Sequence, residues 1–199
     1  MAIPRTRLTL LEKLKDCYDE KSWNEFQEIY APYILKVLRA MNMNSHDCQD
    51  LQQDVLLIVW KSLPKFNYQA DRGSFRAWIS TVSRREVIRF IKKRQKSFIS
   101  SPEEKNEHYA QSLKSVEGAE VENIIQREWE KFISEKAWNN ISSRFSEKVL
   151  GVFQKLSTGV DISTLARESG LSESSIYVYK KRVLNTLQKE ILKLNRELG

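Results

Sequence analysis

The chain has few of the residues that build disulfide-rich, membrane-spanning or strand-rich proteins. Its 199 residues include two cysteines, six glycines and four prolines. No apolar run approaches the length that spans a membrane, and no N-terminal stretch has the pattern of a signal peptide. Two cysteines make no disulfide framework. We therefore expect a cytoplasmic protein with reduced cysteines and no membrane partner.

Residues for metal binding and catalysis are also scarce. His46 and Cys48 lie close together, but no CxxC or HxxxH pair accompanies them. We therefore expect no metal site. The chain has no Gly-rich phosphate cradle, no clear carboxylate cluster and no nucleophile set. We accordingly assign no catalytic residue, expect no cofactor and predict that the protein is not an enzyme.

What the sequence does contain is helical periodicity. Strand patterns are almost absent, and apolar residues recur at helical spacing in segment after segment. Ser22 is the expected cap of one such helix, and Pro64 should end the next. The four N-terminal stripes span 8–14, 23–41, 51–63 and 75–91. The fold class is predicted to be all-α.

A polar segment divides the chain. Residues 95–119 include Pro102 and Gly118 and carry few periodic apolar positions, and periodicity resumes at Val121. Such a composition is typical of a linker. We expect two small helical domains joined by a flexible linker, with bounds of 1–96, 97–120 and 121–199.

The charge is uneven as well as positive. The net charge is +7, and one short segment concentrates cations that Glu86 alone opposes locally. A one-sided run favours a phosphate-binding face, although a solubilising helix end also suits cations. The run consists of Arg84, Arg85, Arg89, Lys92, Lys93, Arg94 and Lys96.

Residues 162–183, ISTLARESGLSESSIYVYKKRV, have the pattern of a helix-turn-helix. Gly170 supplies a turn that needs left-handed backbone, and Ser172 can cap the second helix. Such a second helix commonly reads the major groove of DNA, but an ordinary helical hairpin is the alternative. The inner face is predicted to contain Leu165, Ala166, Leu171, Ile176 and part of Tyr179.

Two further motifs narrow the choice. Residues 50–60, DLQQDVLLIVW, are followed after a short loop by residues 73–79, GSFRAWI. In this order and spacing, ahead of the helix-turn-helix, they resemble the sigma-70 family of RNA polymerase initiation factors, and specifically its extracytoplasmic-function type. The resemblance covers roughly 22–96 and 126–191.

The resemblance implies a sigma factor that binds core RNA polymerase and directs promoter-specific transcription initiation. A free-standing helix-turn-helix transcriptional regulator is the alternative, but it leaves the DLQQD and GSFRAW segments unexplained. Family members contact the clamp helices of the largest polymerase subunit and the flap of the second-largest. Many are held by an anti-sigma factor, although nothing in this sequence identifies one.

The resemblance also assigns roles to individual residues. The DLQQD helix would bind polymerase, because acidic and amide groups suit a protein surface better than DNA phosphates. A solvated helix start is the alternative, since acids also favour an N-terminus. The implied polymerase-binding residues are Asp50, Gln53, Asp54 and Leu57.

DNA contacts are implied at two promoter elements. Where many relatives read ARN, this chain has Ser83–Glu86, so a contact through that asparagine is not carried over. Trp78 is expected to pack in the core rather than to wedge at a duplex fork. The implied minus-ten residues are Asn67, Tyr68, Gln69, Arg72, Arg84, Arg85, Arg89, Lys92 and Lys93. The implied minus-thirty-five residues are Ser174, Ser175, Tyr177, Val178, Lys180, Lys181 and Arg182.

Overall fold

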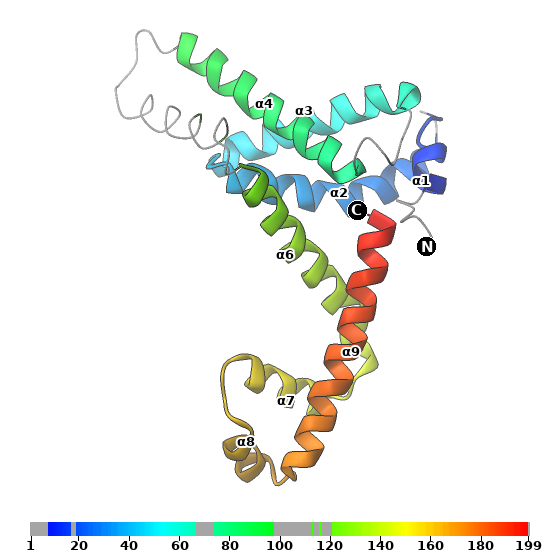
Figure 1. Cartoon of the computed structure of the whole chain (residues 1–199). Helices are drawn as coiled ribbons and strands as arrows, with labels where there is room; N and C mark the ends of the chain where they lie inside the picture. Colours follow the sequence, from blue (N-terminus) through cyan, green and yellow to red (C-terminus); the bar gives the residue numbers. More distant parts are fainter. Residues whose placement is uncertain are drawn as a thin grey trace. The chain divides into compact units, whose positions relative to one another are not determined.

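The computed structural model describes residues 8–16, 19–66, 74–97, 113, 116 and 121–198. Every regular element within these ranges is a helix, so the predicted all-α fold is confirmed (Figure 1). The elements are α1 (Leu8–Lys13), α2 (Glu20–Ala40), α3 (Ser45–Ser62), the 3-10 turn η1 (Leu63–Lys65), α4 (Phe75–Ser97), α6 (Val121–Ile141), the 3-10 turn η3 (Ser142–Arg144), α7 (Glu147–Ser157), α8 (Ile162–Ser169) and α9 (Glu173–Leu198).

The helices form two compact units. The first contains Met1–Lys131 with Glu197–Gly199, and the second contains Phe132–Arg196. The division falls inside α6, whose first half therefore belongs with α2, α3 and α4. The predicted linker at 97–120 lies almost entirely outside the described residues, and its bounds stay a prediction. None of the helices in the described ranges is long and apolar enough to cross a membrane.

Helix α2 begins at a different cap from the one expected. The carboxylate of Asp19 accepts hydrogen bonds from the Ser22 backbone N–H at 3.0 Å and from its hydroxyl at 2.7 Å. The expectation that Ser22 caps the helix is therefore wrong: Ser22 is the third helical residue, and it is buried. The hydroxyl and then the backbone hydrogen bond hold the pKa of Asp19 below its usual value.

An aromatic cluster fills the core of the first unit. Phe26 and Tyr30 of α2 stack with ring centroids 4.8 Å apart, and Phe75 of α4 meets Tyr30 edge-on at 5.4 Å. Trp78 joins the cluster, with its ring centroid 4.5 Å from that of Phe66. These offset and edge-on arrangements are the favourable ones for aromatic pairs. They hold the start of α4 against the middle of α2.

In the second unit, a short left-handed turn joins α8 to α9. Gly170 ends α8 with φ 64° and ψ 20°, the left-handed conformation expected of it. The Ser172 hydroxyl accepts the Ser175 N–H at 3.2 Å, so the cap of α9 is confirmed. The small core contains Val152, Leu165 and Ile176, with Ala166, Leu171 and Tyr179 packed against it.

Asp161 begins α8. Its carboxylate accepts hydrogen bonds from the Ser163 hydroxyl at 2.6 Å and from the Thr164 N–H at 2.9 Å. The Ser163 hydrogen bond, followed by those from Thr164, holds the pKa of Asp161 well below its usual range. The ionised carboxylate therefore stabilises this helix start above the unfolded pKa, and the stabilisation is lost as the pH falls toward the folded one.

Two glycines in the second unit allow a matched test of the turn. Neither Gly170 nor Gly151 has a heavy atom within 4 Å of an added Cβ, so only the backbone distinguishes them. Gly170→Ala should lower the free energy of unfolding by about 1–2 kcal/mol, because alanine is strained in left-handed backbone. Gly151→Ala, inside α7, should raise it by about 0.5–1 kcal/mol. Urea titration followed by circular dichroism measures both, and equal effects would contradict the assigned turn.

Candidate functional site

The predicted polymerase-binding residues share one exposed side of α3. On the opposite side Leu51 and Val55 are fully buried, and the Gln52 Nε2 donates to the Ala31 carbonyl at 2.6 Å. These contacts set the rotation of α3 against α2. Spacing of three and four residues then places the remaining side chains together on the outside. They are Asp50, Gln53, Asp54 and Leu57, all exposed.

The assignment from sequence omitted Trp60. This indole is 39% exposed and lies one turn beyond Leu57, which is 46% exposed. Its position, seven residues after Gln53, was the available signal, since that spacing returns to the same side of a helix. We call the set Asp50, Gln53, Asp54, Leu57 and Trp60 the α3 face.

The predicted minus-ten residues divide between described and undescribed parts of the chain. Asn67, Tyr68, Gln69 and Arg72 lie outside the described residues. On α4, Arg84 is half-buried, and the other cations assigned to this element are exposed. Those exposed residues are Arg85, Arg89, Lys92 and Lys93.

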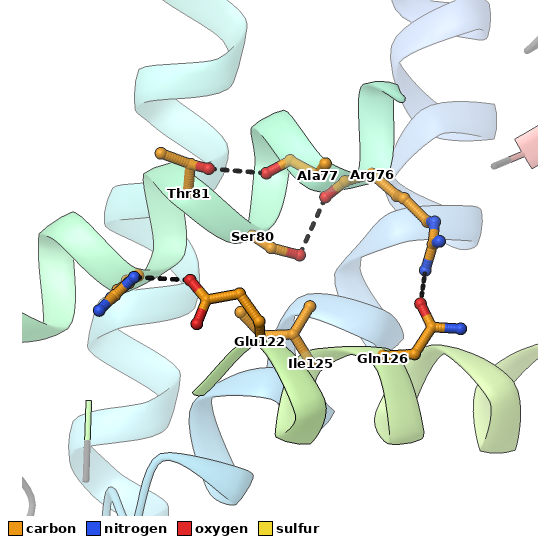
Figure 2. Close-up of a pocket in the computed structure, with 8 residues that line it drawn as sticks. Arg76, Ala77, Ser80, Thr81, Glu122, Ile125 and Gln126 are labelled. Carbon is orange, nitrogen blue, oxygen red and sulfur yellow. Dashed lines mark hydrogen bonds and ion pairs between the residues drawn. The ribbon is translucent and has the colours of Figure 1, made fainter. Parts of the chain in front are cut away.

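Carboxylates hold two of these arginines. Arg89 Nη2 lies 2.7 Å from the Glu86 Oε2, and Glu86 is itself buried. Arg84 Nη1 lies 2.8 Å from the Glu122 Oε1, a partner 38 residues away on α6 (Figure 2). Glu86, the local counter-charge expected from the sequence, is thus present, but it is not the only carboxylate that pairs with an arginine of α4. The basic side of α4 is partly neutralised by a distant helix.

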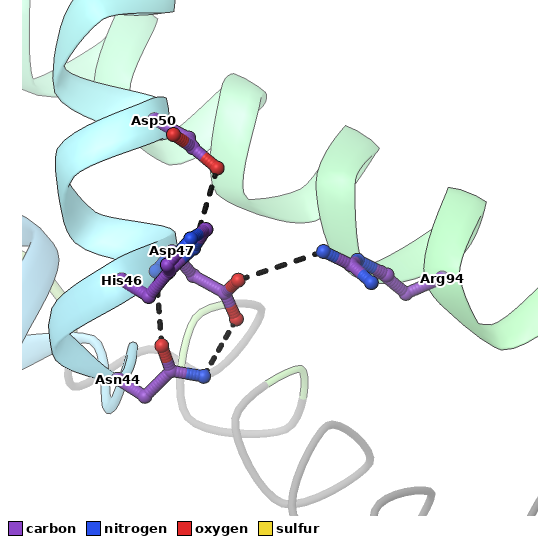
Figure 3. Close-up of polar contacts among 5 residues, drawn as sticks. All are labelled: Asn44, His46, Asp47, Asp50 and Arg94. Atoms are coloured by element: carbon purple, nitrogen blue, oxygen red, sulfur yellow. Dashed lines mark hydrogen bonds and ion pairs between the residues drawn. The ribbon is translucent and has the colours of Figure 1, made fainter.

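A third ion pair ties the end of α4 to the start of α3 (Figure 3). Asp47 is 3% exposed; one of its oxygens accepts the Asn44 side-chain N–H at 2.7 Å, and the other lies 3.7 Å from Arg94 Nη2. Asn44 in turn caps α3 by accepting the Asp47 N–H at 2.9 Å. The Arg94 guanidinium also lies over the Phe90 ring, 5.1 Å from its centroid. Arg94 therefore has a structural role within the basic run.

His46 and Cys48 lie in different environments. Cys48 is fully buried, its Sγ donates to the Met43 carbonyl at 3.4 Å, and burial raises the pKa of its thiol. His46 is exposed, with its Nδ1 3.5 Å from the Asp50 carboxylate. Within the described part of the chain, no three His, Cys, Asp or Glu side chains gather as a metal would require.

The predicted minus-thirty-five residues occupy the first turns of α9. Ser175 is half-buried, and its hydroxyl lies 2.8 Å from that of the cap residue Ser172. The Arg182 guanidinium lies 5.8 Å from the Phe145 ring centroid. The remaining assigned side chains are exposed: Ser174, Tyr177, Val178, Lys180 and Lys181.

The pairing of Asp47 can be tested against its exposed neighbour. Asp47→Ala should lower the free energy of unfolding by about 1–3 kcal/mol, because a buried carboxylate with two polar partners is removed. Asp50→Ala, three residues later on the surface, should change it by less than about 0.5 kcal/mol. Urea unfolding measures both. Similar values for the two variants would mean that the Asp47 contacts do not stabilise the unit.

One comparison with known proteins bears on these surfaces. Residues 26–97 match the family model described as Sigma-70 region 2. The match runs from residue 26, inside α2, through α3 to the end of α4, and thus includes the whole α3 face and the basic side of α4. No curated protein and no solved structure matches the chain. Residues 26–97 are therefore similar to sigma-70 region 2, and this match supports a sigma-70 family assignment for the chain.

Proposed function

We propose that the chain is a sigma factor of the extracytoplasmic-function type, which binds core RNA polymerase and directs promoter-specific initiation. The match of residues 26–97 to sigma-70 region 2 is the observation that carries this proposal. The helix-turn-helix geometry at Gly170 in the second unit supports it. Core polymerase supplies the nucleotidyl transfer chemistry, so the chain needs no catalytic residue or cofactor of its own.

The α3 face is the proposed contact with the clamp helices of the largest polymerase subunit. It combines the carboxylates of Asp50 and Asp54 with exposed apolar area from Leu57 and Trp60. Aromatic and aliphatic anchors beside polar groups are typical of protein interfaces. The same carboxylates would repel DNA phosphates. A protein partner is therefore favoured on this side of the region.

The exposed side of α4 is the proposed contact with the minus-ten element. Arg85, Lys92 and Lys93 offer cations to the phosphates of a melted strand, a contact that weakens strongly with added salt. The loop at 67–72 offers amide, phenol and guanidinium groups that can bind and stack on a flipped base. Binding the melted strand more tightly than the duplex favours open DNA without any covalent step.

The start of α9 is the proposed reader of the minus-thirty-five element. Tyr177 and Val178 are 57% and 61% exposed, and Lys181 lies one turn beyond Tyr177. These side chains can meet base edges, whereas Lys180 and Arg182 are better placed for phosphates. We further propose that this unit contacts the flap of the second-largest subunit. An anti-sigma partner is an expectation from the family alone.

A free-standing helix-turn-helix regulator is the second candidate, favoured only by the geometry of α8 and α9. The two candidates differ in whether core polymerase is a partner. Run-off transcription with core polymerase over a genomic promoter pool separates them. A sigma factor yields promoter-dependent transcripts that are absent with core alone. If no promoter in the pool gives a transcript, the sigma proposal fails.

Charge reversal tests the α3 face. Asp50→Lys with Asp54→Lys should weaken core polymerase binding at least about tenfold, equivalent to about 1.4 kcal/mol. The matched control reverses Glu20 and Glu28, two exposed carboxylates of α2. Binding of the full chain to minus-thirty-five DNA should be unchanged by either pair. Equal losses of polymerase binding in both double variants would remove the α3 face from the interface.

Truncation of Tyr177 tests the upstream contact. Tyr177→Ala should shift the preferred minus-thirty-five sequence and weaken binding to the best site by about 1–3 kcal/mol, the usual cost of one lost base contact. Selection from a randomised upstream element measures the preference. Gln154→Ala, an exposed change on α7, is the control. Unchanged selection with Tyr177→Ala would exclude this side chain from base reading.

A further inference from the structure

Val116 and the first half of α6 make specific polar contacts with α4, within the first unit. Arg84 donates its Nε hydrogen to the Val116 carbonyl at 2.8 Å and an Nη1 hydrogen to the Glu122 carboxylate at 2.8 Å. Arg76, two turns earlier, donates from Nη1 to the Gln126 side-chain oxygen at 2.9 Å (Figure 2). Two arginines of α4 are thus held by one short segment.

A buried aromatic anchor accompanies these polar contacts. Trp129 is 2% exposed and lies under the Arg76 guanidinium, whose carbon is 5.1 Å from the ring centroid. Its ring also meets the Tyr33 ring edge-on, with centroids 5.1 Å apart. Val116 and Val121 are fully buried. Because a burial of this kind contributes more than an exposed ion pair, the apolar residues carry most of the contact.

The polar side of the contact is looser. Glu122 is 66% exposed in its ion pair with Arg84, and solvent therefore screens that attraction. A cavity of about 260 Å³ remains where α4 and α6 meet, bordered by Thr81 and Ile125 among others. Incomplete packing forfeits dispersion contacts along the lining. A contact that is exposed along its polar edge can open there while the core of α2, α3 and α4 stays folded.

We propose that Val116 and residues 121–129 form a clasp that covers α4 in the free protein and opens when the chain engages promoter DNA. The inference rests on the proposed function and on the assignment of Arg84 to the minus-ten contacts by sequence resemblance. Closed, the clasp occupies two donor edges of Arg84 and sets the Glu122 carboxylate where a phosphate would approach. When the clasp is open, Arg84 pairs with a DNA phosphate in place of the Glu122 carboxylate. DNA therefore binds the open form better and shifts the population toward it.

A pair of equal charge changes on α6 tests the clasp. Glu122→Lys places a cation against Arg84, whereas Glu135→Lys makes the same change at an exposed carboxylate outside the clasp. For the free chain, Glu122→Lys should bind a labelled mixed-sequence single-stranded oligonucleotide at least about threefold more tightly than Glu135→Lys. Once each variant is in complex with core polymerase, the two variants should bind promoter DNA with equal affinity. Equal affinities of the free variants would overturn the clasp.

Thiol labelling tests the clasp without relying on DNA affinity. Ile125→Cys lines the cavity, whereas Asn123→Cys replaces an exposed residue outside it; both are made in a Cys17→Ser chain, where Cys48 is buried. In the free chain, maleimide should label Ile125→Cys at least about tenfold more slowly than Asn123→Cys. Addition of core polymerase and promoter DNA should make the two labelling rates equal. Equal rates in the free chain, or protection that persists in the complex, would overturn the proposal. Run-off transcription by the same variants separately reports whether the sigma function holds.

Discussion

Helix α4 must bury one side while carrying arginines and lysines on the other, and the first unit depends on how that charge is balanced. Phe75 and Ile79 hold its inner side against the core. Like charges on one helix repel, and each unpaired cation would raise the cost of folding. Carboxylates from three different elements reduce this repulsion. The pairs are Arg84 with Glu122, Arg89 with Glu86, and Arg94 with Asp47.

The fold could be predicted where the signals are local. Apolar periodicity is sufficient to identify the helices, because one helix buries one stripe whatever it packs against. The turn at Gly170 was predictable because few residues tolerate left-handed backbone. The cap of α2 was not. Asp19 and Ser22 are both good capping residues three positions apart, and the choice depends on which first turn packs better against the core.

In the candidate site, too, local features could be predicted from the sequence and long-range contacts could not. The exposure of Asp54 and Leu57 follows from helix geometry once Leu51 and Val55 are known to face inward. The partners of Arg84 and Arg94 do not follow from local sequence. Glu122 lies 38 residues from Arg84, and Asp47 lies on a neighbouring helix. Only the packing of α3, α4 and α6 brings these charges together, so a basic run read from sequence overstates the cations that remain available.

The distance in sequence between Arg84 and Glu122 has a consequence during synthesis of the chain. Helices α2, α3 and α4 end at Ser97, whereas Glu122 is made 25 residues later. At about 5–20 residues per second, the ribosome needs roughly 1–5 s to cover that interval. For those seconds a nascent chain has the complete aromatic core but lacks the carboxylate that pairs with Arg84. The most basic stretch of the molecule is therefore least shielded beside the ribosome, which is itself rich in phosphate.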